Sequence, residues 1–217
     1  MSAVSHDGTK EDLLLEAASE VFLEKGLSGA RMQEIAARAG VNKGLLHYYF
    51  RSKENIFSRI LQEVLSTFLE QIDVAIPDDM PFVDALRLFI DSFVDYIAAH
   101  PRVPLFMMQE LSRGGKLVNE VIGKAFEKTD IPGKMVRIMR REMDAGRLEP
   151  VNPLHAIITV LGACLYYFLA EPILNAIIAR VEPGLATSRE EFVARRKEEI
   201  FTMLYYGLKK RDGHDAG

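Results

Sequence analysis

Five neighbouring residues carry the most specific chemistry in this sequence. They are Lys43, Gly44, Leu45, His47 and Tyr48. Helical spacing places them on one outer face of a short helix that begins at Lys43. A face with one cation and two polar rings is suited to the major groove of DNA.

A turn and a capping residue are needed to position this face. Gly40 can take the left-handed conformation that ends a helix, and Asn42 can accept hydrogen bonds from the amides that open the next helix. Apolar residues occupy the opposite side: Ile35, Ala36, Ala39, Val41, Leu46 and Tyr49. The spacing predicts a helix-turn-helix. The alternative is an ordinary helical hairpin, in which Gly40 only ends a helix and Lys43, Arg51 and Lys53 form a solvated rim.

The charge is distributed unevenly along the chain. The net charge is −4, yet residues 27–60 hold six basic and two acidic residues, a balance of +4. From Leu61 onward, nineteen basic residues face twenty-three acidic ones, so that part would not attract phosphate by itself. We therefore expect the positive surface to lie on the helix-turn-helix.

Composition restricts the class of protein. The 217 residues suffice for a small domain joined to a larger one. With 48% hydrophobic residues and no apolar run approaching about 20 residues, we expect a soluble protein without a membrane helix. The first nine residues lack the pattern of a secretory signal, which favours the cytoplasm. The single cysteine, Cys164, lies in an apolar stretch and is predicted to be a core residue.

Helical periodicity covers the chain, and no alternating strand pattern occurs, so the fold class is predicted to be all-α. Ser52 caps a fourth helix of roughly 24 residues that Pro77 ends, and Ser188 opens a capping box. Pro172 is expected to kink or divide a long apolar helix. The expected helices run from Lys10 to Gly26, 31–39, 43–50, 53–76, 82–100, 103–111, 117–128, 134–145, 153 past 169, and 189 to about 210.

The segments 35–44 and 46–54 resemble the TetR-type bacterial transcription regulators, and a looser likeness extends from about Lys10 to Phe57. The resemblance implies a DNA-binding domain over residues 1–54 and a helical effector-binding and dimerisation domain over 55–217. It also implies a homodimer that places its third helices on a near-palindromic DNA operator. Such proteins usually repress transcription until a small molecule releases them.

The resemblance assigns roles to single residues. Lys43 and Lys53 would contact phosphate, and Gly44 would let the backbones approach closely. Leu45 stands where relatives often carry threonine. His47 stands where tyrosine is common in the family, and Tyr48 where histidine is common. Ala30 stands where relatives usually have a threonine that caps the second helix and contacts phosphate. We expect this cap and contact to be lost, and Arg31 and Gln33 to compensate for them in part. The DNA-binding set is therefore Arg31, Gln33, Asn42, Lys43, Gly44, Leu45, His47, Tyr48 and Lys53.

A regulator of this kind needs a pocket among the later helices. Aromatic and methionine side chains make adaptable walls, although the same stripes also occur in ordinary cores. The candidates are Phe89, Phe93, Tyr96, Phe106, Met107, Phe126, Tyr166 and Tyr167. Residues 153–180 and 190–208 are candidates for a four-helix dimer interface, or for the middle of the C-terminal core.

The main alternative classes are an enzyme and a protein-interaction module. The five histidines are scattered, and the motifs of zinc hydrolases, paired cysteines, phosphate loops and nucleophile elbows do not occur. We therefore expect no catalytic residues, no metal and no cofactor. An acidic protein partner in place of DNA would make the chain an interaction module.

Overall fold

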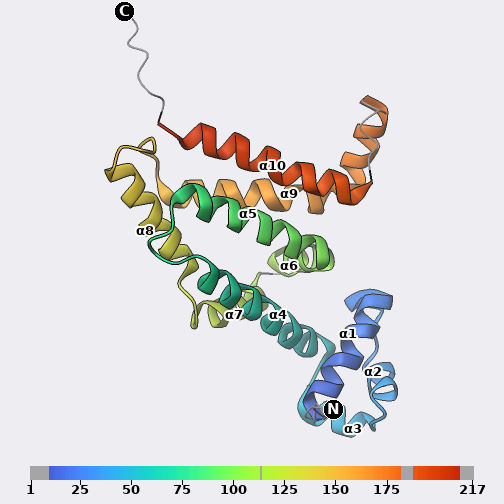
Figure 1. Cartoon of the computed structure of the whole chain (residues 1–217). Helices are drawn as coiled ribbons and strands as arrows, with labels where there is room; N and C mark the ends of the chain where they lie inside the picture. Colours follow the sequence, from blue (N-terminus) through green and yellow to red (C-terminus); the bar gives the residue numbers. More distant parts are fainter. Residues whose placement is uncertain (1–9, 113, 182–187, 211–217) are drawn as a thin grey trace, which may run out of the picture. The chain divides into compact units, whose positions relative to one another are not determined.

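The computed structural model describes residues 10–112, 114–181 and 188–210, and it is built from helices (Figure 1). Within these ranges, the only β pairing is an isolated bridge between Leu148 and Lys209. The helices are α1 (Lys10–Gly29), α2 (Met32–Arg38), α3 (Lys43–Tyr49), α4 (Lys53–Ala75), α5 (Phe82–Ala99), α6 (Arg102–Ser112), α7 (Lys116–Phe126), α8 (Ile131–Asp144), α9 (Pro153–Val181) and α10 (Arg189–Leu208). The all-α prediction is confirmed.

The helix ends follow the capping residues. Ser52 Oγ accepts a hydrogen bond from the Asn55 amide, and Ser188 forms the predicted capping box with Glu191. Gly26 has φ of 69°, so α1 changes direction there although its last residues remain helical. The eighth helix begins at Ile131 and not at Lys134, because Pro132 lies in the first turn, where a proline costs no hydrogen bond.

The chain folds into two compact units. The first holds the residues up to Thr67 together with Asn119–Ala125, and the second holds Phe68–Val118 and the residues from Phe126 onward. Helix α4 contributes residues to both units. The functional boundary after residue 54 stays a prediction.

The first unit has one apolar core to which four helices contribute. Fully buried residues include Leu14 and Val21 of α1, Ile35 of α2, Leu46 of α3 and Ile56 of α4. Burial of each such side chain contributes about 1.5–3 kcal/mol relative to exposure. Since the short helices α2 and α3 bury their apolar sides in this core, their polar sides must face outward.

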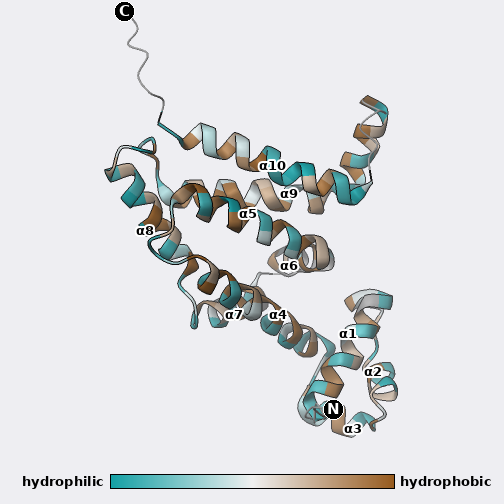
Figure 2. Cartoon of the chain, viewed as in Figure 1, coloured by the Kyte–Doolittle hydropathy of each residue, from teal (hydrophilic) through white to brown (hydrophobic). Residues whose placement is uncertain are grey.

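The second unit is organised around α5. This helix packs against α8, α9 and α10, and Leu86, Ile90 and Val94 on its apolar side are buried. Its charged side is held to α10 by ion pairs, Arg87 with Glu198 and Asp95 with Lys197. Hydrophobic and hydrophilic residues alternate along the ribbon of α5 (Figure 2), which fits a helix that buries one side and pairs the other with α10.

Helix α9 departs from the expectation about membranes. It continues through Pro172 as one helix, and its ribbon bends toward the C-terminal end, so the expected kink is present without a division (Figure 1). The prediction that no apolar run approaches the length of a membrane span is wrong for Pro153–Val181. By length and composition α9 could cross a bilayer, with a mean hydropathy of 1.8 over 18 residues, of which 22% are buried. Its uncovered apolar residues require another explanation.

The end of α8 is fixed by a buried carboxylate. Glu142 accepts two hydrogen bonds from Arg147, at 2.6 and 2.9 Å, and lies 3.5 Å from Arg141 Nε. The hydrogen bonds from Arg147 are the largest cause that holds the pKa of Glu142 below its usual value, and Arg141 adds to the effect. The backbone of Arg147 in turn accepts a hydrogen bond from the Lys210 amide. Glu142 therefore helps to join the ends of α8 and α10.

We predict that Glu142→Gln lowers the free energy of unfolding by about 1–3 kcal/mol at pH 7, because a buried charge-assisted pair loses one partner. The folded carboxyl has the lower pKa, so its stabilisation is complete above the unfolded value near 4.5 and is lost as pH falls through the folded value. Urea unfolding at pH 7 and near pH 3 measures both effects.

Glu120→Gln, at an exposed glutamate of α7, is the matched control for the loss of one negative charge. Equal stabilities of the wild-type protein and Glu142→Gln at pH 7 would contradict the role of Glu142.

Candidate nucleic-acid interface

The turn between α2 and α3 has the geometry that the sequence predicted. Gly40 has φ of 67°, which is the left-handed conformation. Its amide donates to the Ala37 carbonyl at 3.2 Å, and the Val41 amide donates to Ala36 at 3.0 Å. These two bonds satisfy carbonyls at the end of α2 and direct the chain into α3.

The start of α3 is held by Asn42. Its Oδ1 accepts a hydrogen bond from the Leu45 amide at 2.8 Å, as the capping prediction requires. A Cβ atom on Gly44 would lie 3.2 Å from this oxygen, so glycine leaves room for the cap. Asn42 and Gly44 therefore have structural functions within the chain, and their contacts with DNA stay predictions.

The outer face of α3 is open to solvent. Lys43 and His47 are exposed, Tyr48 is 83% exposed, and Leu45 is partly covered. Tyr49 was expected in the core, but it is 39% exposed and its ring lies edge-on to Tyr48, with centroids 5.5 Å apart. The expectation for Tyr49 was wrong because α3 ends there, at the border of the core.

The residues around the start of α2 and of α4 are arranged differently from the face of α3. The N-cap of α2 is Arg31 and not Ala30 as expected, and its side chain makes no capping bond, so Arg31 does not replace the lost cap; Gln33 is exposed. Lys53 Nζ donates to the carbonyls of Ser28 and Ala30, both at 3.1 Å. Lys53 thus holds the link between α1 and α2 to the start of α4, a function that the sequence did not reveal.

Ion pairs within the first unit determine which of its positive side chains remain free to contact phosphate. Residues 10–67 contain eight basic and eight acidic residues. Five of the acidic residues lie on α1: Glu11, Asp12, Glu16, Glu20 and Glu24. Arg38 binds Glu24 through two hydrogen bonds, which hold the pKa of Glu24 below its usual value. Further pairs join Arg59 to Glu11 and Lys25 to Glu34.

Between residues 31 and 53, four cations have no ion-pair partner among the described residues: Arg31, Lys43, Arg51 and Lys53, of which Lys53 is hydrogen-bonded to two carbonyls. The local excess of positive charge is therefore carried by fewer residues than the count of six suggested. Glu24 and Glu11 of α1 pair with Arg38 and Arg59, and a count that begins at Leu27 does not include these two acidic residues.

The predicted effector residues fall into separate groups. Phe89, Phe93 and Tyr96 lie along α5, and the ring of Tyr96 stacks on Phe68 of α4 at 4.4 Å. The Tyr96 hydroxyl is buried without a hydrogen-bond partner among the described residues, and burial raises its pKa to about 12.

Among the described residues, no ring contact joins Phe126, Tyr166 or Tyr167 to this group. Tyr167 is buried and stacks on Phe192, Met107 is partly buried, and Phe126 and Tyr166 are exposed. The side chain of Phe106 lies outside the described part of the structure. A role in effector binding stays a prediction for all eight residues.

Comparison with known proteins agrees with this geometry. Residues 14–60 match the family described as bacterial regulatory proteins, tetR family. The HTH-type transcriptional regulator RutR of Escherichia coli K12 is 26% identical over 93% of this chain and 92% of its own length. The HTH-type transcriptional repressor NicS of Pseudomonas putida is 25% identical over 77% of this chain and 80% of its length.

A similar fold is found in the transcriptional regulator FadR of Bacillus subtilis, solved in complex with stearoyl-CoA. The TM-score is 0.67 at 17% identity, over 90% of this chain and 98% of that one. The relatives are transcriptional regulators and not enzymes, and the family match covers all the buried residues of the first core, from Leu14 to Ile56. Residues 14–60 therefore carry the DNA-binding domain of the tetR family of bacterial regulatory proteins, and the chain is similar to helix-turn-helix transcriptional regulators over most of its length.

Proposed function

We propose that this protein is a homodimeric repressor that binds a near-palindromic DNA operator and is released by a small molecule. The observation that carries the proposal is the outer face of α3, where a free cation and two polar rings project from a capped helix held by a buried core. A recognition helix in the major groove needs this arrangement.

The contacts follow from the chemistry of each residue. Lys43 and Arg31 neutralise phosphates, and His47 and Tyr48 donate hydrogen bonds to phosphates or base edges. Leu45 offers apolar contact to a thymine methyl group but no hydrogen bond. Lys53 uses two of its three ammonium hydrogens on carbonyls, which leaves one for a phosphate.

The apolar face of α9 and α10 supports the proposed dimer. Ile158 is 66% exposed, and other large apolar side chains on the same two helices are uncovered: Leu154, Tyr166, Ile173, Ile177, Met203 and Tyr206. A soluble protein rarely leaves such a patch open to water. Two copies of α9 and α10 would cover it as a four-helix bundle, which also accounts for the membrane-like composition of α9.

The aromatic group at Phe68, Phe93 and Tyr96 supports effector binding in the second unit. A buried hydroxyl without a partner costs about 1–3 kcal/mol, and a ligand that hydrogen-bonds it would recover that cost. The stearoyl-CoA complex of FadR supports a small-molecule site in this fold.

Helix α4 supplies the proposed route from effector to DNA. It is continuous from Lys53 to Ala75 and contributes to both units. Two recognition helices fit adjacent half-sites when they lie about 34 Å apart, so a shift of α4 that changes this separation would weaken binding.

We predict that Lys43→Ala weakens operator binding and lowers the slope of log affinity against log salt by about 0.9, the value for one phosphate contact. Fluorescence anisotropy with an operator selected from random duplexes, at several salt concentrations, gives the slope. Lys116→Ala on α7 removes the same charge and is the control. An unchanged slope removes Lys43 from the phosphate contacts. Binding to an acidic protein but to no duplex would favour the interaction module.

We predict that Ile158→Glu weakens dimerisation at least about hundredfold, since a carboxylate would be buried without a partner. Multi-angle light scattering over a dilution series should then report the 24.4 kDa monomer. Val74→Glu changes a still more exposed apolar residue on α4, 85% exposed, and should leave the mass unchanged. A dimer that persists in Ile158→Glu would place the interface elsewhere.

We predict that Tyr96→Phe raises the free energy of unfolding of the ligand-free protein by about 1 kcal/mol, because it removes a buried hydroxyl without a partner. Urea unfolding without DNA measures the change, with Tyr48→Phe at a tyrosine that is 83% exposed as the control. A loss of stability would show that the Tyr96 hydroxyl is hydrogen-bonded within the protein, which contradicts its proposed availability to an effector.

A further inference from the structure

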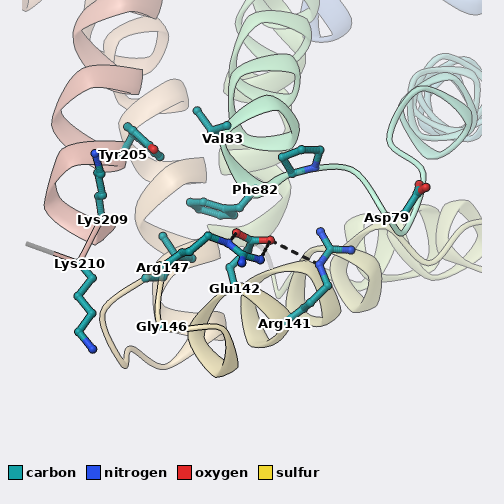
Figure 3. A pocket seen from close by; sticks show the side chains of 12 residues that line it. Asp79, Phe82, Val83, Arg141, Glu142, Gly146, Arg147, Tyr205, Lys209 and Lys210 are labelled. Atoms are coloured by element: carbon teal, nitrogen blue, oxygen red, sulfur yellow. Dashed lines mark hydrogen bonds and ion pairs between the residues drawn. The ribbon is translucent and has the colours of Figure 1, made fainter. Parts of the chain in front are cut away.

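The second unit contains a cavity of about 1050 Å³ that none of the predicted DNA-binding or effector residues lines. It lies where the link into α5, the end of α8 and the end of α10 meet (Figure 3). The lining residues with charge are Asp79, Arg141, Glu142, Arg147, Lys209 and Lys210. Four cations against two acidic residues leave an excess of two positive charges.

Two of the cations are held in fixed positions. Arg147 forms a two-point contact with the Glu142 carboxylate, and Arg141 Nε lies 3.5 Å from the same group. Arg141 also donates to the carbonyls of Asp78 and Met80. One carboxylate thus orients two guanidinium groups but neutralises only one of them. An anion entering this cavity would meet a charge that is already positioned.

The remaining cations lie at the end of α10. Neither Lys209 nor Lys210 has an ion-pair partner among the described residues. Both follow the carboxyl end of a helix, whose partial charge is about −0.5, and the end of α8 contributes a similar amount. The start of α5, which no side chain caps, adds about +0.5. Helix ends therefore offset less than half of the excess positive charge.

The walls between these charges are apolar. The ring of Phe82 lies beside the Glu142 and Arg147 pair, and Val83, Leu148 and Tyr205 complete the wall (Figure 3). The volume lies just above the range of about 300–1,000 Å³ typical of small-molecule sites and far exceeds the needs of a single inorganic ion.

From this combination we propose a second ligand site in this protein, which binds an organic anion with two or more negative charges attached to an aromatic or other apolar group. The anionic groups are separated on the ligand, one on Arg141 and the others on Lys209 and Lys210, which project in opposite directions from the end of α10 (Figure 3), and the apolar group packs on Val83 and Tyr205, which are partly exposed. All lining residues belong to the second unit, so binding does not depend on the proposed DNA contacts.

A fluorescent reporter can be placed in the cavity because the chain has no tryptophan. In Tyr205→Trp, we expect a saturable change in emission with adenosine 5′-diphosphate or with benzene-1,3,5-tricarboxylate, at a dissociation constant below about 1 mM. The two probes distinguish a phosphate ligand from a carboxylate ligand. Adenosine, which has the ring without the charge, should give no saturable change. Tyr48→Trp reports anion binding at α3 separately.

The lysines provide the decisive variant. Lys209→Gln with Lys210→Gln should weaken binding of the better probe about tenfold, since two exposed charge pairs with the anion are lost. Lys116→Gln with Lys124→Gln removes the same charge from α7 and should leave affinity unchanged. Calorimetry on the chain with its native Tyr205 verifies that the reporter does not alter binding.

Three results would overturn the proposal. They are no saturable response to either anion up to about 10 mM, equal binding of adenosine, and equal affinity in the Lys209 and Lys210 variant. Circular dichroism and thermal unfolding of each variant separate a loss of binding from a loss of fold.

Discussion

Burial of Leu46 is the interaction on which the recognition surface depends. Helix α3 has seven residues, and a helix of that length is not stable alone in water. Leu46 is completely buried between α1, α2 and α4, and Asn42 caps the first turn. Because Leu46 faces the core, Lys43, His47 and Tyr48 must face solvent. The chemistry of the outer face is therefore set by an apolar contact on the inner face.

Electrostatic pairing then refines that surface. Acidic residues of α1 form ion pairs with Arg38 and Arg59, and Lys53 donates hydrogen bonds to the carbonyls of Ser28 and Ala30. These pairs connect α1 with α2 and α4, and they leave few cations free. Exposed ion pairs each contribute only about 0.2–1 kcal/mol, so their main effect here is on which charges remain available.

In the second unit, the uncovered surface indicates partners as clearly as the buried surface indicates the fold. Helix α5 has a buried apolar side and a paired charged side, whereas α9 leaves large apolar residues open along its length. A second copy would cover the apolar face. The cationic cavity at the ends of α8 and α10 lies among polar groups and suits a ligand of different chemistry.

The sequence by itself determined the helices, the turn at Gly40, the caps at Asn42, Ser52 and Ser188, and the face of α3. These features depend on neighbours within one or two helical turns, and local backbone geometry specifies them. Only the tertiary structure decided that Lys53 bonds to carbonyls near Ser28, that α1 neutralises Arg38, and that Arg141 and Lys209 line one cavity. Such contacts join residues far apart in the chain, and no periodicity or spacing records which distant side chains will meet.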